Sequence, residues 1–148
     1  MGYKNASSTY KETKVKTAGQ GQLIIMLYDE AIRQLTKAVE LLETDNKQKK
    51  DPSKIEQISK AVMKAEEIIT ELMVSLDFEQ GGEISKNLFA LYTWFNRELL
   101  EANIAQDIKR IKTVKDMLSE LGNSWNEIAG KYTADTSNRE AVGLNIAG

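Results

Sequence analysis

The chain of 148 residues contains no cysteine and no histidine. Without cysteine it has no disulfide framework, no thiolate nucleophile and no cysteine-ligated zinc site. Without histidine it also lacks the commonest catalytic base and the metal-binding imidazole. The 20 basic and 22 acidic residues give a formal charge of -2, so the chain lacks the basic patch expected of a protein that binds nucleic acid.

Long apolar runs are also missing from the sequence. No stretch approaches the roughly 20 apolar residues that are needed to span a bilayer. Residues 1–16 are polar where a signal peptide would have an apolar core. We therefore expect a protein of the cytoplasm that does not insert into membranes.

Carboxylates occur in groups, but not in a pattern that indicates catalysis or metal binding. Helical bundles that hold two iron ions use Glu-x-x-His pairs, which a chain without histidine cannot form. Glu66 with Glu67, and Asp77 with Glu79 and Glu83, lie on polar helix faces or in a turn, where solvated charges are expected. Phosphate-binding glycine loops and nucleophile motifs are also missing. The sequence therefore predicts no enzyme, no cofactor and no metal site.

Apolar residues recur at intervals of three and four along most of the chain, as in amphipathic helices. Pro52, the only proline, stands where the first turn of a helix is expected, and Asp107 is a candidate N-cap. Gly81 and Gly82 can adopt positive φ in the turn between two helices. The predicted helices span residues 22–43, 53–76, 81–103 and 106–130. Four such helices joined by short turns predict an all-α fold, an antiparallel up-down-up-down four-helix bundle.

The bundle is expected to occupy residues 21–130 as one domain. Residues 1–20 are polar and rich in serine, threonine and lysine, so they are predicted to form a flexible, irregular N-terminal arm. Residues 131–148 are mostly polar with a few apolar residues. This C-terminal tail is consistent with either a short docked helix or a disordered segment.

The stretch from Gly81 to Asn103 has more apolar surface than one core-facing helix needs. At about 3.6 residues per turn, one stripe predicted to face the core contains Ile84, Leu88, Leu91, Phe95, Leu99 and Ala102. A second stripe, nearly opposite, contains Phe89, Leu100 and Ile104. The preceding helix carries a weaker second stripe with Met63, Thr70 and Val74. Either the third helix is central in the fold, or its second face is kept for a partner.

Three asparagines lie in this region, Asn87, Asn96 and Asn103. Their amides could bind the backbone of a guest segment, or they could cap helices and form bonds inside the protein. A groove between adjacent helices is a natural receptor for an amphipathic segment of another protein. The same stripes could instead pair two copies of the chain, so the alternative is a non-catalytic oligomerisation or scaffold module.

Several motifs, taken together, resemble one known family. The first is TAxxxxLIIMLYDEAI at Thr17 to Ile32, with MLYD at its centre. The second is GGEISKNL followed by Leu91 and Tyr92, and the third is Ala102 and Asn103 with Asp107. In this order and spacing, from about Tyr10 to Ile128, the chain resembles the flagellar secretion chaperone family FliS.

The resemblance implies an antiparallel helical bundle that binds the disordered C-terminal segment of flagellin in the bacterial cytoplasm. It would prevent premature filament assembly and assist flagellin secretion through the flagellar export apparatus. An export-gate component and a co-chaperone are further expected partners, and the chain is expected to be a monomer or weak dimer. Tyr10 matches a recurrent tyrosine of the family's arm. The residues expected to bind the partner are Tyr10, Met63, Val74, Asn87, Phe89, Tyr92, Asn96, Leu100, Asn103 and Ile104.

Overall fold

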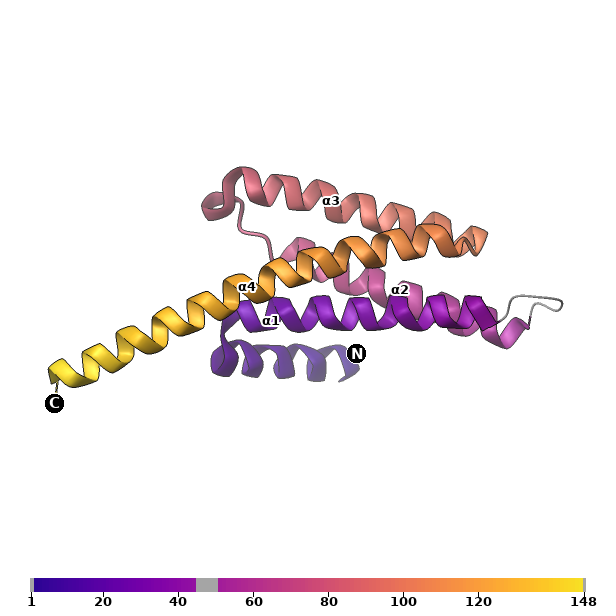
Figure 1. Cartoon of the computed structure of the whole chain (residues 1–148). Coiled ribbons are helices and arrows are strands. Elements are labelled where there is room, and N and C mark those ends of the chain that lie inside the picture. Colours follow the sequence, from indigo (N-terminus) through magenta and orange to yellow (C-terminus); the bar gives the residue numbers. More distant parts are fainter. Residues whose placement is uncertain (1, 45–50, 148) are drawn as a thin grey trace. The chain divides into compact units, whose positions relative to one another are not determined.

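The computed structural model describes the backbone of residues 2–44 and 51–147 and the side chains of residues 21–44 and 51–128. Four helices account for nearly all of the described backbone (Figure 1). They are α1 (Gly2–Thr44), α2 (Pro52–Val74), α3 (Phe78–Ala105) and α4 (Ile108–Ala147). The prediction of an all-α fold is confirmed. In the described part of the chain, no helix combines the length and the hydropathy needed to cross a bilayer.

The compact unit Met26–Ser119 contains the bundle. It consists of the second half of α1, all of α2 and α3, and the start of α4. Successive helices run in opposite directions within it (Figure 1), so the predicted up-down-up-down arrangement is confirmed. The other described parts of α1 and α4 belong to a second unit.

The two ends of the chain differ from the sequence prediction in secondary structure. Residues 2–20 belong to α1, not to an irregular arm, and residues 131–147 continue α4 to Ala147. Neither segment contains proline, so every residue keeps its backbone donor. Gly19 and Gly21 each cost a helix about 1 kcal/mol relative to alanine, which weakens α1 without ending it. The continuous helix α4 is neither of the two alternatives for the tail, which were a short docked helix and a disordered segment.

Three aspartates begin three of the helices. The side chains of Asp51, Asp77 and Asp107 each accept hydrogen bonds from backbone N–H groups two or three residues later, at 3.0 to 3.3 Å. An N-terminal turn has unpaired N–H groups, and these carboxylates satisfy some of them. Pro52 occupies the first turn of α2. The predicted roles of Pro52 and Asp107 are therefore confirmed.

Two glycines shape the first turns of α3. Gly82 has φ 50° and ψ -123°, a conformation that interrupts the helix and that residues with a Cβ rarely adopt. Gly81 has no positive φ, contrary to expectation. A Cβ there would lie 1.8 Å from Ser85 Oγ, which donates a hydrogen bond to the backbone oxygen of Asp77. Gly81 is thus needed for close packing and Gly82 for its backbone conformation.

The core of the unit Met26–Ser119 is formed by one apolar stripe from each helix. Its fully buried members include Tyr28 and Leu35 of α1, Ile58, Val62, Ile69 and Leu72 of α2, Tyr92, Phe95 and Leu99 of α3, and Ile111, Val114 and Leu118 of α4. The hydroxyl groups of Tyr28 and Tyr92 are hydrogen bonded at 2.5 Å. This bond joins α1 to α3 inside the core.

The predicted core stripe of α3 is correct for Phe95, Leu99 and Ala102 but not for its first member. Ile84 is 69% exposed, whereas Tyr92 is only 2% exposed. Ile84 comes two residues after the break at Gly82, so it lies in the exposed first turn of the regular helix. A helical period that ignores the break at Gly82 therefore predicts the wrong burial for Ile84.

Charged side chains connect α4 to its neighbours. The guanidinium group of Arg110 donates to both carboxylate oxygens of Glu98 at 3.0 and 2.8 Å and also to Glu101. This hydrogen bond lowers the pKa of the Glu98 carboxyl group. Lys112 Nζ lies 3.0 Å from Glu43 Oε1 of α1. An exposed pair such as Lys112–Glu43 contributes about 0–1 kcal/mol, so it defines which helices are neighbours more than it stabilises the bundle.

The Tyr28–Tyr92 hydrogen bond gives a test of the core. Tyr92→Phe should lower the free energy of unfolding by about 1 kcal/mol, because the buried hydrogen bond between the two hydroxyl groups is lost. Tyr28→Phe should cost at least as much. The double variant should cost less than the two single losses together, since both single variants lose the same hydrogen bond. Urea unfolding monitored by circular dichroism measures all three. Strictly additive losses would show that the two hydroxyl groups do not interact.

Candidate functional site

Two side-chain hydrogen bonds hold α2 and α3 in antiparallel register. Ser59 Oγ donates to Asn103 Oδ1 at 3.1 Å. Asn96 Nδ2 donates to Thr70 Oγ1, also at 3.1 Å. Thr70 comes after Ser59 in α2, whereas its partner Asn96 comes before Asn103 in α3. This order is expected when the two helices run in opposite directions. The two bonds therefore mark one line along which the helices meet.

Large apolar side chains are exposed along this line. Phe89 and Leu100 share the face of Asn96 because they lie two turns before it and one turn after it. Met63 and Val74 share the face of Ser59 and Thr70 in the same way. We call this surface the α2–α3 seam; its residues are Ser59, Met63, Glu66, Thr70 and Val74 of α2 and Phe89, Asn96, Leu100, Asn103 and Ile104 of α3.

The apolar members of the seam are exposed to an unusual degree. The exposed fractions are 55% for Met63, 81% for Val74, 43% for Phe89, 53% for Leu100 and 78% for Ile104. Single exposed apolar residues are ordinary on protein surfaces, but five on the adjoining faces of two packed helices favour a binding surface.

Phe78 extends the apolar end of the seam and was not predicted from the sequence. Its ring meets the ring of Phe89 edge-on, with centroids 5.8 Å apart, and it is 47% exposed. The sequence around Phe78 was predicted to form a turn, because Gly81 and Gly82 follow it. The one sequence feature that could have indicated a binding residue here is the presence of a large aromatic side chain next to the start of a helix.

The structure brings together seven of the ten residues that were predicted to bind a partner. They are Met63, Val74, Phe89, Asn96, Leu100, Asn103 and Ile104. Tyr92 is instead a core residue, because its ring is buried and its hydroxyl is bonded to Tyr28. Asn87 is exposed but lies about half a turn around α3 from Asn96, off the seam. The side chain of Tyr10 lies outside the described residues.

The asparagines of the seam are used inside the protein. Asn103 accepts from Ser59, and the Asn96 amide nitrogen donates to Thr70. Of the two alternatives left open by the sequence, intramolecular bonding is therefore present for both side chains. These bonds do not satisfy every polar atom, because Asn96 Oδ1 has no hydrogen-bond partner among the described side chains.

Two acceptor oxygens in the seam are screened from solvent. Neither Glu66 Oε1 nor Asn96 Oδ1 has a hydrogen-bond partner among residues 21–44 and 51–128. The Thr70 hydroxyl connects the two residues, since it donates to the backbone oxygen of Glu66 at 2.9 Å and accepts from Asn96. Burial raises the pKa of the Glu66 carboxyl group, because the charged form loses solvation.

The expectation that Glu66 and Glu67 form a solvated pair is wrong for Glu66. Glu67 is exposed, whereas Glu66 is half-buried. Consecutive residues point about 100° apart on a helix, so only one of the two can lie between α2 and α3. Glu66 lies two turns after Ser59 and one turn before Thr70. This spacing was the feature of the sequence that could have placed it on their face of α2.

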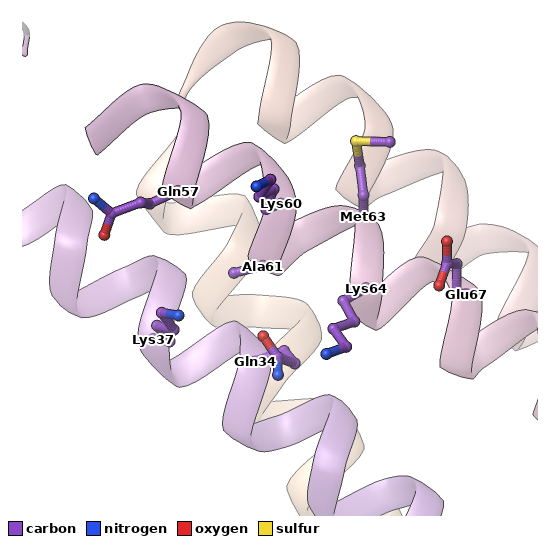
Figure 2. A pocket seen from close by; sticks show the side chains of 8 residues that line it. All are labelled: Gln34, Lys37, Gln57, Lys60, Ala61, Met63, Lys64 and Glu67. Carbon is purple, nitrogen blue, oxygen red and sulfur yellow. The ribbon is translucent and has the colours of Figure 1, made fainter. Parts of the chain in front are cut away.

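A hollow lies between α1 and α2. It measures about 390 Å³ and is lined by Gln34, Lys37, Gln57, Lys60, Ala61, Met63, Lys64 and Glu67. Figure 2 shows Lys64 extending toward Gln34 of α1. Three lysines and one glutamate are among its lining residues, and Met63 belongs both to this lining and to the seam. Within the described part of the chain, no three acidic residues gather in a way that could hold a metal ion.

The comparisons with known proteins all indicate the same family. A sequence model described as Flagellar protein FliS matches residues 3–132. The chain is 37% identical to the flagellar secretion chaperone FliS of Salmonella typhimurium strain LT2 over 136 residues, which cover 92% of this chain and 96% of that protein. The corresponding protein of Escherichia coli K12 is 34% identical over 116 residues, 78% and 80% of the two chains. That of Bacillus subtilis 168 is 28% identical over 127 residues, 86% and 88%.

The half-buried carboxylate of Glu66 makes a prediction about stability and pH. Because its pKa is raised in the folded state, the folded protein binds this proton more readily than the unfolded chain, and ionised Glu66 opposes folding. Glu66→Gln should therefore be more stable than wild type at neutral pH. The advantage should shrink as the pH falls through the raised pKa toward the ordinary value of 4.5.

Chemical denaturation across this pH range measures the difference, with Glu67→Gln as the control. Glu67→Gln removes the same charge from the adjacent exposed position and should show no such trend. A Glu66→Gln protein that is less stable than wild type at neutral pH would mean that the carboxylate is well paired.

Proposed function

The chain belongs to the FliS family of flagellar proteins, and from this premise we propose that it is a secretion chaperone for flagellin. It binds the disordered C-terminal segment of flagellin in the bacterial cytoplasm, prevents premature polymerisation and assists secretion through the flagellar export apparatus. Its action is stoichiometric binding and not catalysis. A component of the export gate and a co-chaperone are further proposed partners, on the strength of the family resemblance.

The observation that carries this proposal is the exposed apolar face of the α2–α3 seam. A segment that becomes helical on binding can lay its apolar side on a surface of this kind. While that side is covered it is not available for assembly into a filament. The seam would thus protect the guest and be protected by it, since both surfaces are apolar.

The energetics favour a guest that covers the whole seam. Ordering a disordered segment costs about 2–5 kcal/mol. Covering the exposed half of one large apolar side chain returns about 1 kcal/mol. One contact cannot offset the cost of ordering, whereas Met63, Val74, Phe89, Leu100 and Ile104 together can. The guest is therefore expected to follow the seam along its length and not to occupy one pocket.

Pairing of two copies of the chain through the same seam is the competing function. Two copies would also cover the apolar side chains, as expected of an oligomerisation module. We propose instead that the chain is a monomer or weak dimer that binds one guest. Sedimentation of the full chain with and without a flagellin C-terminal peptide separates the two, because a stable dimer that excludes the peptide contradicts the chaperone function.

We further propose that the N-terminal segment with Tyr10 covers the guest site when no guest is bound. The support is the position of Tyr10 in the family resemblance, together with the tendency of exposed apolar surfaces to aggregate. Displacement of this segment would accompany guest binding.

Calorimetric titration with a flagellin C-terminal peptide tests the function and the site. Wild type should bind one equivalent. Phe89→Asp and Leu100→Asp should each weaken binding by about tenfold or more, since burying a new charge in an apolar contact is strongly unfavourable. Absence of binding by wild type would contradict the function. Unchanged binding by both variants would contradict the site and leave the function intact.

Two control variants make the titration specific. Ile84→Asp introduces the same charge into α3 at a residue that is 69% exposed but off the seam. Lys64→Glu changes the charge of the hollow between α1 and α2. Both should bind the peptide within about twofold of wild type, because neither alters the seam. All variants are first compared by circular dichroism, so that loss of fold is not mistaken for loss of contact.

Hydrogen exchange tests the proposed role of the N-terminal segment. Amides of residues 3–18 should exchange more slowly in the protein without guest than in the complex, because the guest displaces the segment. Tyr10→Ala should abolish the difference. Equal exchange of these amides with and without peptide would exclude a covering role.

A further inference from the structure

The seam contains more hydrogen-bond acceptors than the neighbouring side chains satisfy. Glu66 Oε1 and Asn96 Oδ1 lie on facing helices and are screened from solvent, and neither has a partner among residues 21–44 and 51–128. The Thr70 hydroxyl bonds to both residues, at the Glu66 backbone oxygen and at the Asn96 amide nitrogen. Glu66, Thr70 and Asn96 therefore form a small polar cluster within an apolar surface, joined through the Glu66 backbone and not through its carboxylate.

The two hydroxyl donors that α2 carries on this face are engaged in other hydrogen bonds. The Ser59 hydroxyl donates to Asn103 Oδ1, and the Thr70 hydroxyl donates to a backbone oxygen. The Asn96 amide is oriented by its bond to Thr70, which directs its nitrogen to α2 and leaves its oxygen unpaired. A ligand that completes this cluster must bring N–H or O–H groups.

The carboxylate narrows the class of donor. An unpaired buried acceptor is costly, and a buried carboxylate costs more than a neutral oxygen unless a cation or several donors pair with it. A guanidinium or ammonium group supplies both positive charge and several donors, so it can serve the carboxylate and the amide oxygen together. Burial, which raises the pKa of Glu66, is the signature of a carboxylate held without such a partner.

The apolar neighbours determine how a ligand reaches the oxygens. Met63 lies one turn before Glu66 on the same face of α2, and Leu100 lies one turn after Asn96 on α3. Both side chains are more than half exposed. Methionine is unbranched and changes conformation readily, so a bound segment can displace it and place a long side chain between the helices.

We propose that the α2–α3 seam selects a guest segment in which an arginine or lysine stands among apolar residues and donates hydrogen bonds to Glu66 Oε1 and Asn96 Oδ1. The inference rests on the proposed function, in which flagellin is the guest, and adds the chemical feature by which the seam recognises it. The apolar side chains supply affinity along the seam, and the basic side chain sets the register of the guest.

A comparison of two adjacent glutamates tests the proposal. Full-length wild type, Glu66→Gln and Glu67→Gln are titrated with a flagellin C-terminal peptide. Glu66→Gln should bind about tenfold or more weakly, since it keeps the shape of the side chain but removes a charge-assisted hydrogen bond. Glu67→Gln makes the same change of charge at the exposed neighbour and should bind within about twofold of wild type. The loss in Glu66→Gln should persist at high salt, because a buried pair is weakly screened.

Replacing the basic residues of the peptide by glutamine, one at a time, identifies the donor. One replacement should weaken binding to wild type by about tenfold and leave binding to Glu66→Gln nearly unchanged, as expected for a coupled pair. If Glu66→Gln binds as tightly as wild type or more tightly, or if every peptide replacement acts equally on both proteins, the inference is wrong while the chaperone function stands. If wild type does not bind the peptide at all, the proposed function fails and the inference fails with it.

Discussion

The burial of Tyr92 and Phe95 determines how the rest of the structure is arranged. Both rings lie in the core, and the Tyr92 hydroxyl is bonded across the bundle to Tyr28. A helix held at two such points cannot rotate about its axis without exposing large aromatic surfaces, at a cost of about 1.5–3 kcal/mol for each ring. With α3 fixed in this way, its period places Phe89, Asn96 and Leu100 beside α2 and partly in solvent.

The seam is therefore a consequence of core packing as much as a surface feature. Its polar bonds, from Ser59 to Asn103 and from Asn96 to Thr70, keep the two helices in register without covering the apolar side chains between them. A bundle optimised for stability alone would place polar residues at these exposed positions. Keeping apolar side chains in solvent, together with a carboxylate in a half-buried position, is the kind of departure expected at a functional surface.

The two chemical components of the seam have different effects on a guest. Apolar contacts are non-directional, so they give affinity without fixing the position of a flexible segment. The acceptors of Glu66 and Asn96 are directional and are satisfied only by a correctly placed donor. A chaperone needs both properties, because its guest must be held over an extended surface and yet be released at a defined destination. The polar cluster is small compared with the apolar surface, so under our proposal it would contribute more to the choice of guest than to total affinity.

Most of the fold could be predicted from the sequence, because helix period, capping residues and helix breakers act over a few neighbouring residues. The four helices, the first turn at Pro52 and the N-cap at Asp107 depend on such local effects. So does the membership of Phe95, Leu99 and Ala102 in the core stripe. The helical state of residues 2–20 and 131–147 was missed, or left open, because polar composition does not by itself prevent helix formation in segments without proline.

The site could be predicted only in outline. Periodicity alone identified the apolar second faces of α2 and α3, including Met63, Phe89 and Leu100. It did not decide that Tyr92 lies in the core, that Asn87 lies off the seam or that Glu66 differs from Glu67. These outcomes depend on the rotation of α3 and on the register of α2 against it, which arise from contacts between residues far apart in the chain. The sequence by itself determined which helices have more apolar surface than the core can bury. Only the tertiary structure decided where the apolar faces of α2 and α3 meet and which acceptors there stay unpaired.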